Sequence, residues 1–130
     1  HAVKDMGTFS EESCDYPMIG YKVAKLVAAR VYSRGILICK TGIGMSMVAN
    51  KVRGVRAALC DRPDIARSSR EHNDSNILVL AANIVTTGKA KKILGAWLMA
   101  KHLGARHARR VGQIKEIEGF EYEGIKKSRP

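Results

Sequence analysis

Aromatic residues are scarce in this sequence, since Phe, Trp and Tyr make up 5% of its 130 residues. None of them lies within the three basic clusters, at residues 89–92, 106–110 and 126–129. Proteins that bind single-stranded nucleic acid stack bases on aromatic side chains, and that signature is missing here. The formal net charge of +11 is compatible with an acidic membrane, an anionic small molecule or a solubilising helix face. We therefore expect no nucleic acid partner.

Long hydrophobic runs and paired cysteines are also absent. No apolar stretch approaches the roughly 20 residues that span a bilayer, and the first residues, HAVKDMGTF, lack the layout of a signal peptide. The cysteines Cys14, Cys39 and Cys60 are odd in number, form no CxxC pair and have no histidine nearby, which indicates no metal site. We expect a cytoplasmic protein with reduced thiols and no membrane partner.

Short β-branched runs alternate with longer stretches of helical period, as in a parallel sheet covered by helices. The predicted strands are 3–6, 36–39, 55–60 and 77–81, and 36–39 is apolar throughout, as when both faces of a sheet are covered. The predicted helices begin near Pro17, at Met45, at an Asp61 cap before Pro63, near Gly88 and after Gly104. The length and the 45% hydrophobic content predict one α/β domain.

Two features concern the ends of the chain. About four strands are predicted, whereas a doubly wound sheet has five or more, and a missing strand would leave an exposed edge. We therefore expect a further βα unit before His1. Residues 119–130 are polar, and we expect them to form a loose C-terminal segment beyond a domain of residues 1–118.

The segment KTGIG, residues 40–44, follows a strand that ends in Cys39. In open α/β sheets ligands bind at the carboxyl ends of strands, and the amides at a helix start hold anions. A thiolate there is favoured by the same positive helix end, and the amides stabilise an oxyanion. The alternative is a buried, inert Cys39 beside a tight glycine turn. Neither a trailing GK[ST] nor a third glycine is present, since position 47 is Met47.

Two further groups of residues carry candidate chemistry. His72 and Asn73 lie between a predicted helix and a strand, where a histidine can transfer protons or merely cap the helix end. Arg106 and Arg110 are four residues apart on one helical face, which suits a phosphate clamp. A solvated basic face is the alternative interpretation of that spacing.

Four motifs together resemble one family. They are GTFSEESCDYP at 7–17, ILICKTGIGMSMVANKVRGVRAALC at 36–60, SREHNDSN at 69–76 and GARHARRV at 104–111. The sequence from residue 1 to about 118 is similar to ribose-5-phosphate isomerases of type B, whose wider group includes galactose-6-phosphate, allose-6-phosphate and tetrulose-4-phosphate isomerases. The resemblance implies a Rossmann-like three-layer sandwich with a parallel sheet, and a homodimer or tetramer with active sites between subunits.

The resemblance also implies roles for single residues. Cys39 matches the catalytic base, and His72, helped by Thr41, matches the group that opens the sugar ring. Asn73 matches an amide that orients the substrate, and Arg106 with Arg110 matches the phosphate clamp. The main-chain amides that match the anion hole belong to Gly42, Ile43, Gly44, Met45 and Ser46. One branch of the family has a glutamate base in the loop, where this sequence has Met45.

Three departures from the family pattern stand out. The family's first strand ends in an Asp-His pair that touches the sugar, and this sequence has no such segment. Lys40 replaces a glycine that is usual in the family, and Asn83 replaces an arginine that binds phosphate in many members. The resemblance therefore implies an altered phosphate contact, with Lys40 as a candidate ligand, or a different sugar.

These observations predict an aldose–ketose isomerase acting on a phosphorylated sugar, with ribose 5-phosphate and ribulose 5-phosphate as the first candidates. The resemblance implies neither a metal nor an organic cofactor. An isomerase of a tetrose or hexose phosphate is one alternative. A protein that binds a sugar phosphate or nucleic acid without catalysis is another.

Overall fold

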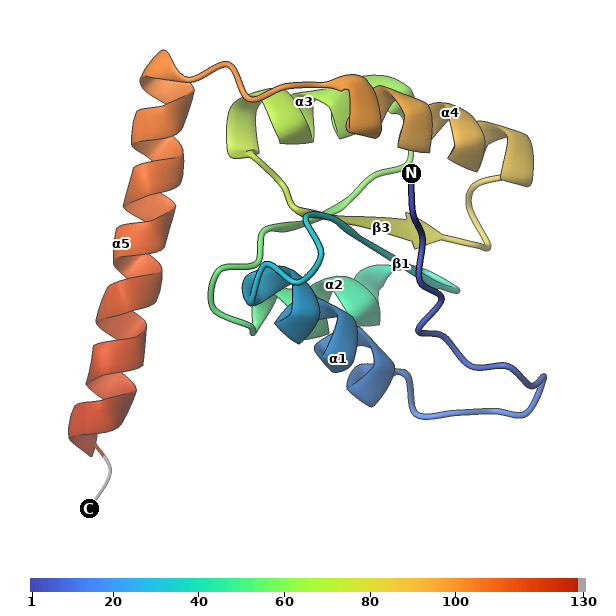
Figure 1. Ribbon diagram of the computed structural model, residues 1–130, viewed down its shortest axis with the longest axis horizontal. Coiled ribbons are helices and arrows are strands. Elements are labelled where there is room, and N and C mark those ends of the chain that lie inside the picture. The colour runs from blue at the N-terminus through green and yellow to red at the C-terminus, as the bar shows by residue number, and fades with distance from the viewer. Residues whose placement is uncertain (129–130) are drawn as a thin grey trace.

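The computed structural model describes residues 1–128, which form a parallel sheet with helices on both faces (Figure 1). The strand order is β1-β3-β2. The strands are β1 (Gly35–Cys39), β2 (Ala57–Leu59) and β3 (Ile77–Ala81). The helices are α1 (Tyr16–Ala28), α2 (Ile43–Asn50), α3 (Pro63–Asn73), α4 (Thr87–Met99) and α5 (Ala105–Ser128). The predicted α/β, Rossmann-like three-layer sandwich with a parallel sheet is confirmed.

The core lies on the two faces of the central strand β3, all of whose residues are buried. Ile77 and Val79 pack with α1 and α2 on one face. Leu78 and Leu80 pack with α3 and α4 on the other, where the Trp97 side chain is fully buried. An unbroken apolar run is what a strand with both faces covered requires, which is why this strand could be predicted with correct bounds.

The edge strand β1 differs from the prediction. Leu37 packs against the helices of one face, but Ile36 and Ile38 on the other face are 41% and 58% exposed. The expectation that both faces of this strand are covered is therefore wrong, because α3 and α4 pack over β2 and β3 instead. The expected βα unit before His1 stays a prediction, for which the free edge of β1 leaves room.

Residues 1–15 form neither helix nor strand. The predicted strand at 3–6 is wrong, and three strands are found among the described residues instead of about four. The Val3 side chain is 86% exposed, so no burial stabilises a strand at this position. Regular structure begins at Tyr16, with Pro17 in the first turn of α1 as predicted.

The N-cap of helix α3 lies one residue after the predicted cap. The N-cap is Arg62 in an extended conformation, not Asp61, and Pro63 starts the helix. Arg62 forms an ion pair with Asp64 at 3.1 Å between Arg62 Nε and Asp64 Oδ1. The fixed φ of proline suits the first helical position, so the helix start follows Pro63 rather than the acidic side chain.

The long helix α5 replaces the expected loose segment. It runs through residue 118 to Ser128, while residues 129–130 of that segment lie outside the described residues. Two contacts fasten its middle to the loop before β2: Gly54 N donates to Glu118 Oε1 at 2.9 Å, and the Arg53 guanidinium lies 4.9 Å from the centre of the Tyr122 ring. A domain boundary near residue 118 stays a prediction.

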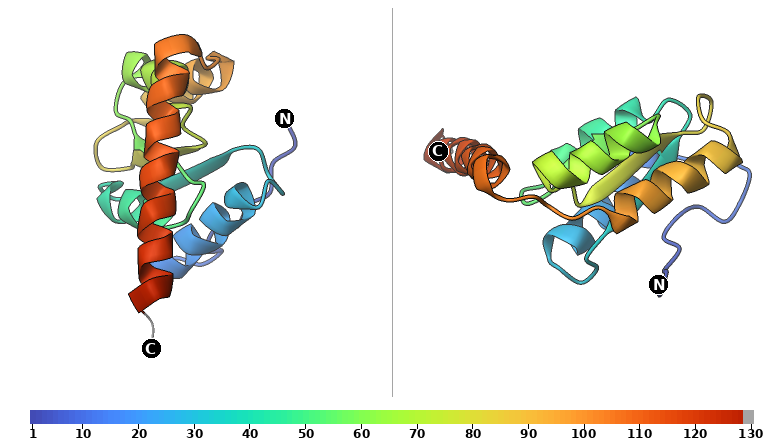
Figure 2. Two further views of the ribbon diagram at one scale, coloured as in Figure 1. Left: turned by 90° about the vertical axis from the view of Figure 1, so that its left-hand side faces the viewer. Right: turned by 90° about the horizontal axis from the view of Figure 1, so that it is seen from above.

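Figure 2 shows α5 running down one side of the molecule, away from the stacked layers of the sheet and the other helices. In Figure 1 the β3 arrow points away from α5, so α5 lies at the amino end of that strand. Within residues 1–128, no helix is both long and apolar enough to cross a membrane.

Candidate functional site

Cys39 is the last residue of β1 and lies half-buried at the carboxyl edge of the sheet. Its carbonyl accepts a hydrogen bond from the amide of Ala82 at 2.9 Å, which fixes the strand end against the residue after β3. Its Sγ accepts one from the amide of Gly42 at 3.2 Å. The thiol therefore points toward the loop that leads into α2.

The glycines of this loop are required by space. Gly42 has φ of 74°, a left-handed conformation that favours glycine. A β-carbon at this position would also overlap the Leu59 side chain. At Gly44 the backbone is helical, but a β-carbon would overlap the phenol of Tyr16. Tyr16 therefore covers the first turn of α2, a contact that sequence reasoning missed because the two segments are far apart in the chain.

Some of the backbone amides at the start of α2 donate hydrogen bonds within the described residues, and others do not. The amide of Ile43 donates to Thr41 Oγ1 at 3.3 Å, and that of Ser46 donates to the Gly42 carbonyl at 3.0 Å. Within the described part of the chain, the amides of Gly44 and Met45 have no acceptor. Free first-turn amides at the positive end of a helix attract anions. Of the five amides predicted for the anion hole, these two are the ones left free to donate.

The side chain of Met45 is buried in the core, so this residue offers only its main chain to the site. Lys40 and Asn83, the two unusual positions, are neighbours. The amide of Asn83 donates to the Lys40 carbonyl at 3.0 Å, and both residues are exposed. Lys40 is therefore a cation at the same rim as Cys39.

His72 and Asn73 occupy the last turn of α3 rather than a loop, so the loop placement is wrong. The helix continues because its end is set by Asp74, which adopts the left-handed conformation with φ of 47°. Aspartate adopts this conformation more readily than most residues. Asp74 N donates to the Arg70 carbonyl, and the Asp74 carboxylate pairs with Arg70 and Arg56 at 2.9 and 3.1 Å.

His72 stacks on His107 of α5. The ring centroids are 4.3 Å apart and the planes differ by 8°. His107 is 9% exposed, and its pKa is lowered by burial, with smaller contributions from the charges of His72, Arg106, Arg110 and His102. Arg106 and Arg110 are exposed in the first two turns of α5, close to this histidine pair along the helix. His107 is a second residue that sequence reasoning did not single out.

A buried polar network holds this end of α3. The Trp97 indole N–H donates to Ser75 Oγ at 2.8 Å, and Ser75 Oγ lies 2.8 Å from Ser69 Oγ. The Arg70 guanidinium donates to the Ser75 carbonyl, and its cation lies 5.9 Å from the centre of the Trp97 ring. Arg70 Nε is the one buried polar side-chain atom of the described residues that has no partner. The hydrogen bonds that are made tie the end of α3 to β3 and α4.

The predicted site residues therefore form two separate groups. Cys39 pairs with Ala81 at the carboxyl end of β3, whereas Asn73 precedes Ile77 at its amino end. The two ends of β3 are about 13 Å apart, because each residue of a parallel strand advances about 3.3 Å. Within one chain, the loop with Cys39 and the cluster with His72 face opposite ends of the sheet.

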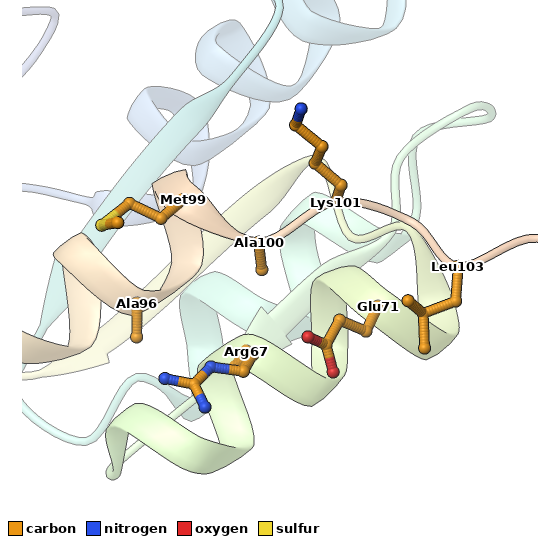
Figure 3. Close-up of a pocket in the computed structure, with 7 residues that line it drawn as sticks. All are labelled: Arg67, Glu71, Ala96, Met99, Ala100, Lys101 and Leu103. Carbon is orange, nitrogen blue, oxygen red and sulfur yellow. The ribbon is translucent and has the colours of Figure 1, made fainter.

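A pocket of about 380 Å³ lies between α3 and the end of α4, outside both groups (Figure 3). It is lined by Arg67, Glu71, Ala96, Met99, Ala100, Lys101 and Leu103. None of the predicted site residues is among them. Within residues 1–128, no cluster of three or more His, Cys, Asp or Glu side chains is placed to hold a metal ion.

Comparison with known proteins identifies relatives for almost the whole chain. Residues 1–114 match the family model described as Ribose/Galactose Isomerase. Ribose-5-phosphate isomerase B of Escherichia coli is 47% identical over 116 residues, which are 89% of this chain and 78% of that protein. D-erythrulose-4-phosphate isomerase of Pectobacterium atrosepticum is 41% identical over 103 residues, which are 79% of this chain and 68% of that protein.

The fold has relatives among solved structures as well. The structure of Clostridium thermocellum ribose-5-phosphate isomerase B superposes with a TM-score of 0.89 at 51% identity, covering 91% of this chain and 80% of that one. The residues matched by the family model, 1–114, include all four motifs. The chain belongs to the ribose/galactose isomerase family.

Proposed function

We propose that this chain is an aldose–ketose isomerase that interconverts ribose 5-phosphate and ribulose 5-phosphate. Relatives from Escherichia coli and Clostridium thermocellum are named for ribose 5-phosphate isomerisation. The observation that carries the proposal is Cys39 Sγ beside the first turn of α2, where the amides of Gly44 and Met45 are free within the described residues. A proton-abstracting group next to free donors is what an enediolate intermediate requires.

Cys39, as the thiolate, removes the proton from C2 of the open-chain aldose. The electron pair of that C–H bond forms the C1–C2 double bond, and the carbonyl electrons move to O1, where the amides of Gly44 and Met45 stabilise the charge. A proton passes from O2 to O1, and the thiol returns its proton to C1. The product is the ketose, Cys39 is regenerated, and no oxidant or reductant is consumed.

The remaining predicted residues act on the ring and the phosphate. His72 and Thr41 open the sugar ring by moving a proton between its oxygens, and Asn73 orients the open chain. Arg106 and Arg110 are exposed and lie four residues apart on α5, and their guanidinium groups bind the phosphate. Lys40 adds a second positive charge at the rim of the Cys39 loop.

We further propose that each active site combines two copies of the chain. Cys39 and His72 lie at opposite ends of β3 in one chain, farther apart than a five-carbon sugar allows for direct contact with both groups. A twofold dimer places the cluster with His72, Arg106 and Arg110 of one copy against the Cys39 loop of the other. Such an isologous contact creates two equivalent sites at once.

A four-carbon sugar phosphate is the second candidate substrate. The relative from Pectobacterium atrosepticum is named for D-erythrulose 4-phosphate, so the family includes more than one substrate. The adjacent Lys40 and Asn83 lie at the rim of the Cys39 loop, where contacts with the substrate would depend on its length. Relative kcat/KM for pentose and tetrose phosphates distinguishes these candidates, and a Lys40→Gly variant tests whether the cation sets the preference.

The first test is proton NMR of ribose 5-phosphate in deuterium oxide, with Cys39→Ala as the control. The proposal predicts loss of the C2 proton signal with the natural protein and a rate lower by several powers of ten with the variant, as when a catalytic base is removed. Circular dichroism establishes that both proteins are folded. An unchanged C2 signal with folded natural protein contradicts the pentose assignment, and tetrose and hexose phosphates are then assayed in the same way.

The reducing cytoplasm is the compartment that we propose for this enzyme. Cys14, Cys39 and Cys60 are all free, and a thiol base works only while it is reduced. Fractionation of the producing cells, with a cytoplasmic marker enzyme, tests this location.

A further inference from the structure

The His107 ring occupies a fixed place beside His72. It belongs to the first turn of α5 and is 9% exposed, and its face lies parallel to that of His72 at 4.3 Å. A stacked contact uses the faces of the two rings, so the nitrogen atoms at the edge of His72 are not consumed by it. His107 therefore limits the rotation of His72 without occupying its hydrogen-bonding atoms.

The chain just before α5 is fastened to the same turn of α3 that carries His72. The amide of Leu103 donates to the Glu71 carbonyl at 3.0 Å, and His102 Nδ1 lies 3.0 Å from that same oxygen. Gly104 and Ala105 then take left-handed conformations, with φ of 72° and 50°, and turn the chain into α5. The segment that leads to His107 is thus held at Glu71, the residue next to His72.

The charges around the pair favour a neutral His107. Burial lowers its pKa, and the positive charges of Arg106 and Arg110 act in the same direction. Two parallel imidazoles at this distance repel one another when both are protonated. A neutral, flat and buried ring is a suitable support for a second histidine that must move protons.

We propose that His107 is a positioning residue for His72, holding the His72 ring in the orientation from which it opens the sugar ring. This inference rests on the proposed isomerase function, in which His72 acts on the cyclic substrate and Cys39 on the open chain. His107 touches His72 and acts through it. Its removal slows the ring-opening step and leaves the proton transfer by Cys39 intact.

The two steps are separated by choice of substrate. Ribose 5-phosphate is mainly a closed ring, so its conversion needs ring opening. Ribulose 5-phosphate cannot close through its phosphorylated C5 oxygen, so deuterium uptake at its C1 needs only the base. In His107→Ala we expect the ratio of ribose 5-phosphate conversion to C1 deuterium uptake to fall roughly tenfold or more, as when acid–base help is impaired. His72→Ala is the reference for complete loss of the step.

A planar aromatic side chain in place of His107 is expected to keep the stacking contact with His72. We expect His107→Phe to retain a ratio within about threefold of the natural protein, because an aromatic ring of similar thickness preserves the stack. Parallel loss of both rates in His107→Ala, an unchanged ratio, or a His107→Phe ratio as low as that of His107→Ala overturns the proposal. If the natural protein takes up no deuterium from ribulose 5-phosphate, the isomerase function itself is contradicted.

A spectroscopic measurement tests the positioning without activity. The ring protons of His72 lie above an aromatic face, so their NMR shifts report the stack. We expect a change in these shifts in His107→Ala and near-retention in His107→Phe, with folding of both variants checked in the same spectra. Unchanged His72 ring signals in His107→Ala overturn the proposal whatever the kinetics.

Discussion

At the scale of single residues, the three thiols have different surroundings. Cys60 is 1% exposed, donates to the Ala58 carbonyl at 3.6 Å and has its pKa raised chiefly by burial. Cys39 is half-buried at the sheet edge and Cys14 is exposed. Because the thiolate is the reactive form, chemical modification distinguishes the three positions.

We expect iodoacetamide to label Cys14 and Cys39 in the folded protein and Cys60 at least about a hundredfold more slowly, because Cys60 requires local opening. Activity falls in step with labelling of Cys39, and substrate slows both. Peptide mass spectrometry over time measures each site, with Cys14→Ser as the control that keeps its activity. Labelling of Cys60 at the rate of Cys39 would contradict the described core.

The lowered pKa of His107 makes a prediction for stability. The neutral ring is favoured in the folded state, so the unfolded chain binds more protons once the pH falls through about 6.5, the ordinary value. The stabilising contribution is therefore present above that pH and is lost as the pH falls toward the lowered folded value. The groups that face this ring are His72, His102, Arg106 and Arg110.

We expect His107→Phe to flatten the decline in melting temperature between pH 7.5 and 5, since phenylalanine does not titrate. Thermal unfolding at half-unit pH steps, for the variant and the natural protein in matched buffers, measures the two slopes. Parallel curves would show that His107 contributes nothing to the pH dependence.

How well the sequence predicted site residues depended on the range of the interaction. Cys39, Thr41 and Gly42 lie at a strand end and in the turn that follows it, so local patterns were sufficient to predict their places, while their roles stay predictions. Tyr16 and His107 touch residues from distant segments, and no local pattern reveals such contacts. The spacing of His107 and Val111 was the one sequence signal for His107. The two residues are four apart, so they share one face of α5, and both are buried.

At the scale of elements, the start of α2 depends on a glycine beside an aromatic ring. We expect Gly44→Ala to destabilise the protein by about 1 kcal/mol, because the added methyl group overlaps the outer part of the Tyr16 ring, which must shift. In a Tyr16→Ala background the same change is expected to be neutral or stabilising, because alanine favours a helix over glycine by about 1 kcal/mol. Urea unfolding of the four proteins measures this coupling.

The matched control is Gly88→Ala. Gly88 lies in the first turn of α4, and a β-carbon there meets nothing within 4 Å. We expect this change to be neutral or stabilising in either background. A Gly44→Ala effect that is the same with and without Tyr16 would rule out steric overlap as its cause.

Among the elements, β3 was predicted with correct bounds and α5 was not. The run ILVLA is apolar throughout and is bounded by Asn76 and by the turn after Ala81, so composition defines it. The second half of α5 is polar and has little buried surface, so its sequence resembled a loose segment. Contacts such as Glu118 with Gly54 stabilise it, and these join residues far apart in the chain.

At the scale of the whole molecule, the separation of Cys39 from His72 predicts complementation between inactive variants. In a mixed dimer of Cys39→Ala and His72→Ala chains, one site carries both changes and the other carries neither. Random assortment makes half of all dimers mixed, so we expect about a quarter of natural activity after the two inactive proteins are unfolded and refolded together.

Each variant refolded alone is the control, and size-exclusion chromatography establishes the state of association. Recovered activity in the mixture alone supports a site shared between copies. No recovery from folded, mixed dimers would mean that each site draws Cys39 and His72 from the same chain.

The parallel pairing of β1 with β3 also affects how the rate depends on the amount of protein. Cys39 and His72 lie at opposite ends of one short sheet, so under the proposed shared site a lone chain would carry two half-sites that face away from each other. For a site completed by a second copy, turnover at extreme dilution falls with the square of chain concentration rather than in proportion to it. Under the proposed shared site, the short register between β1 and β3 therefore determines how steeply the rate falls when the protein is diluted.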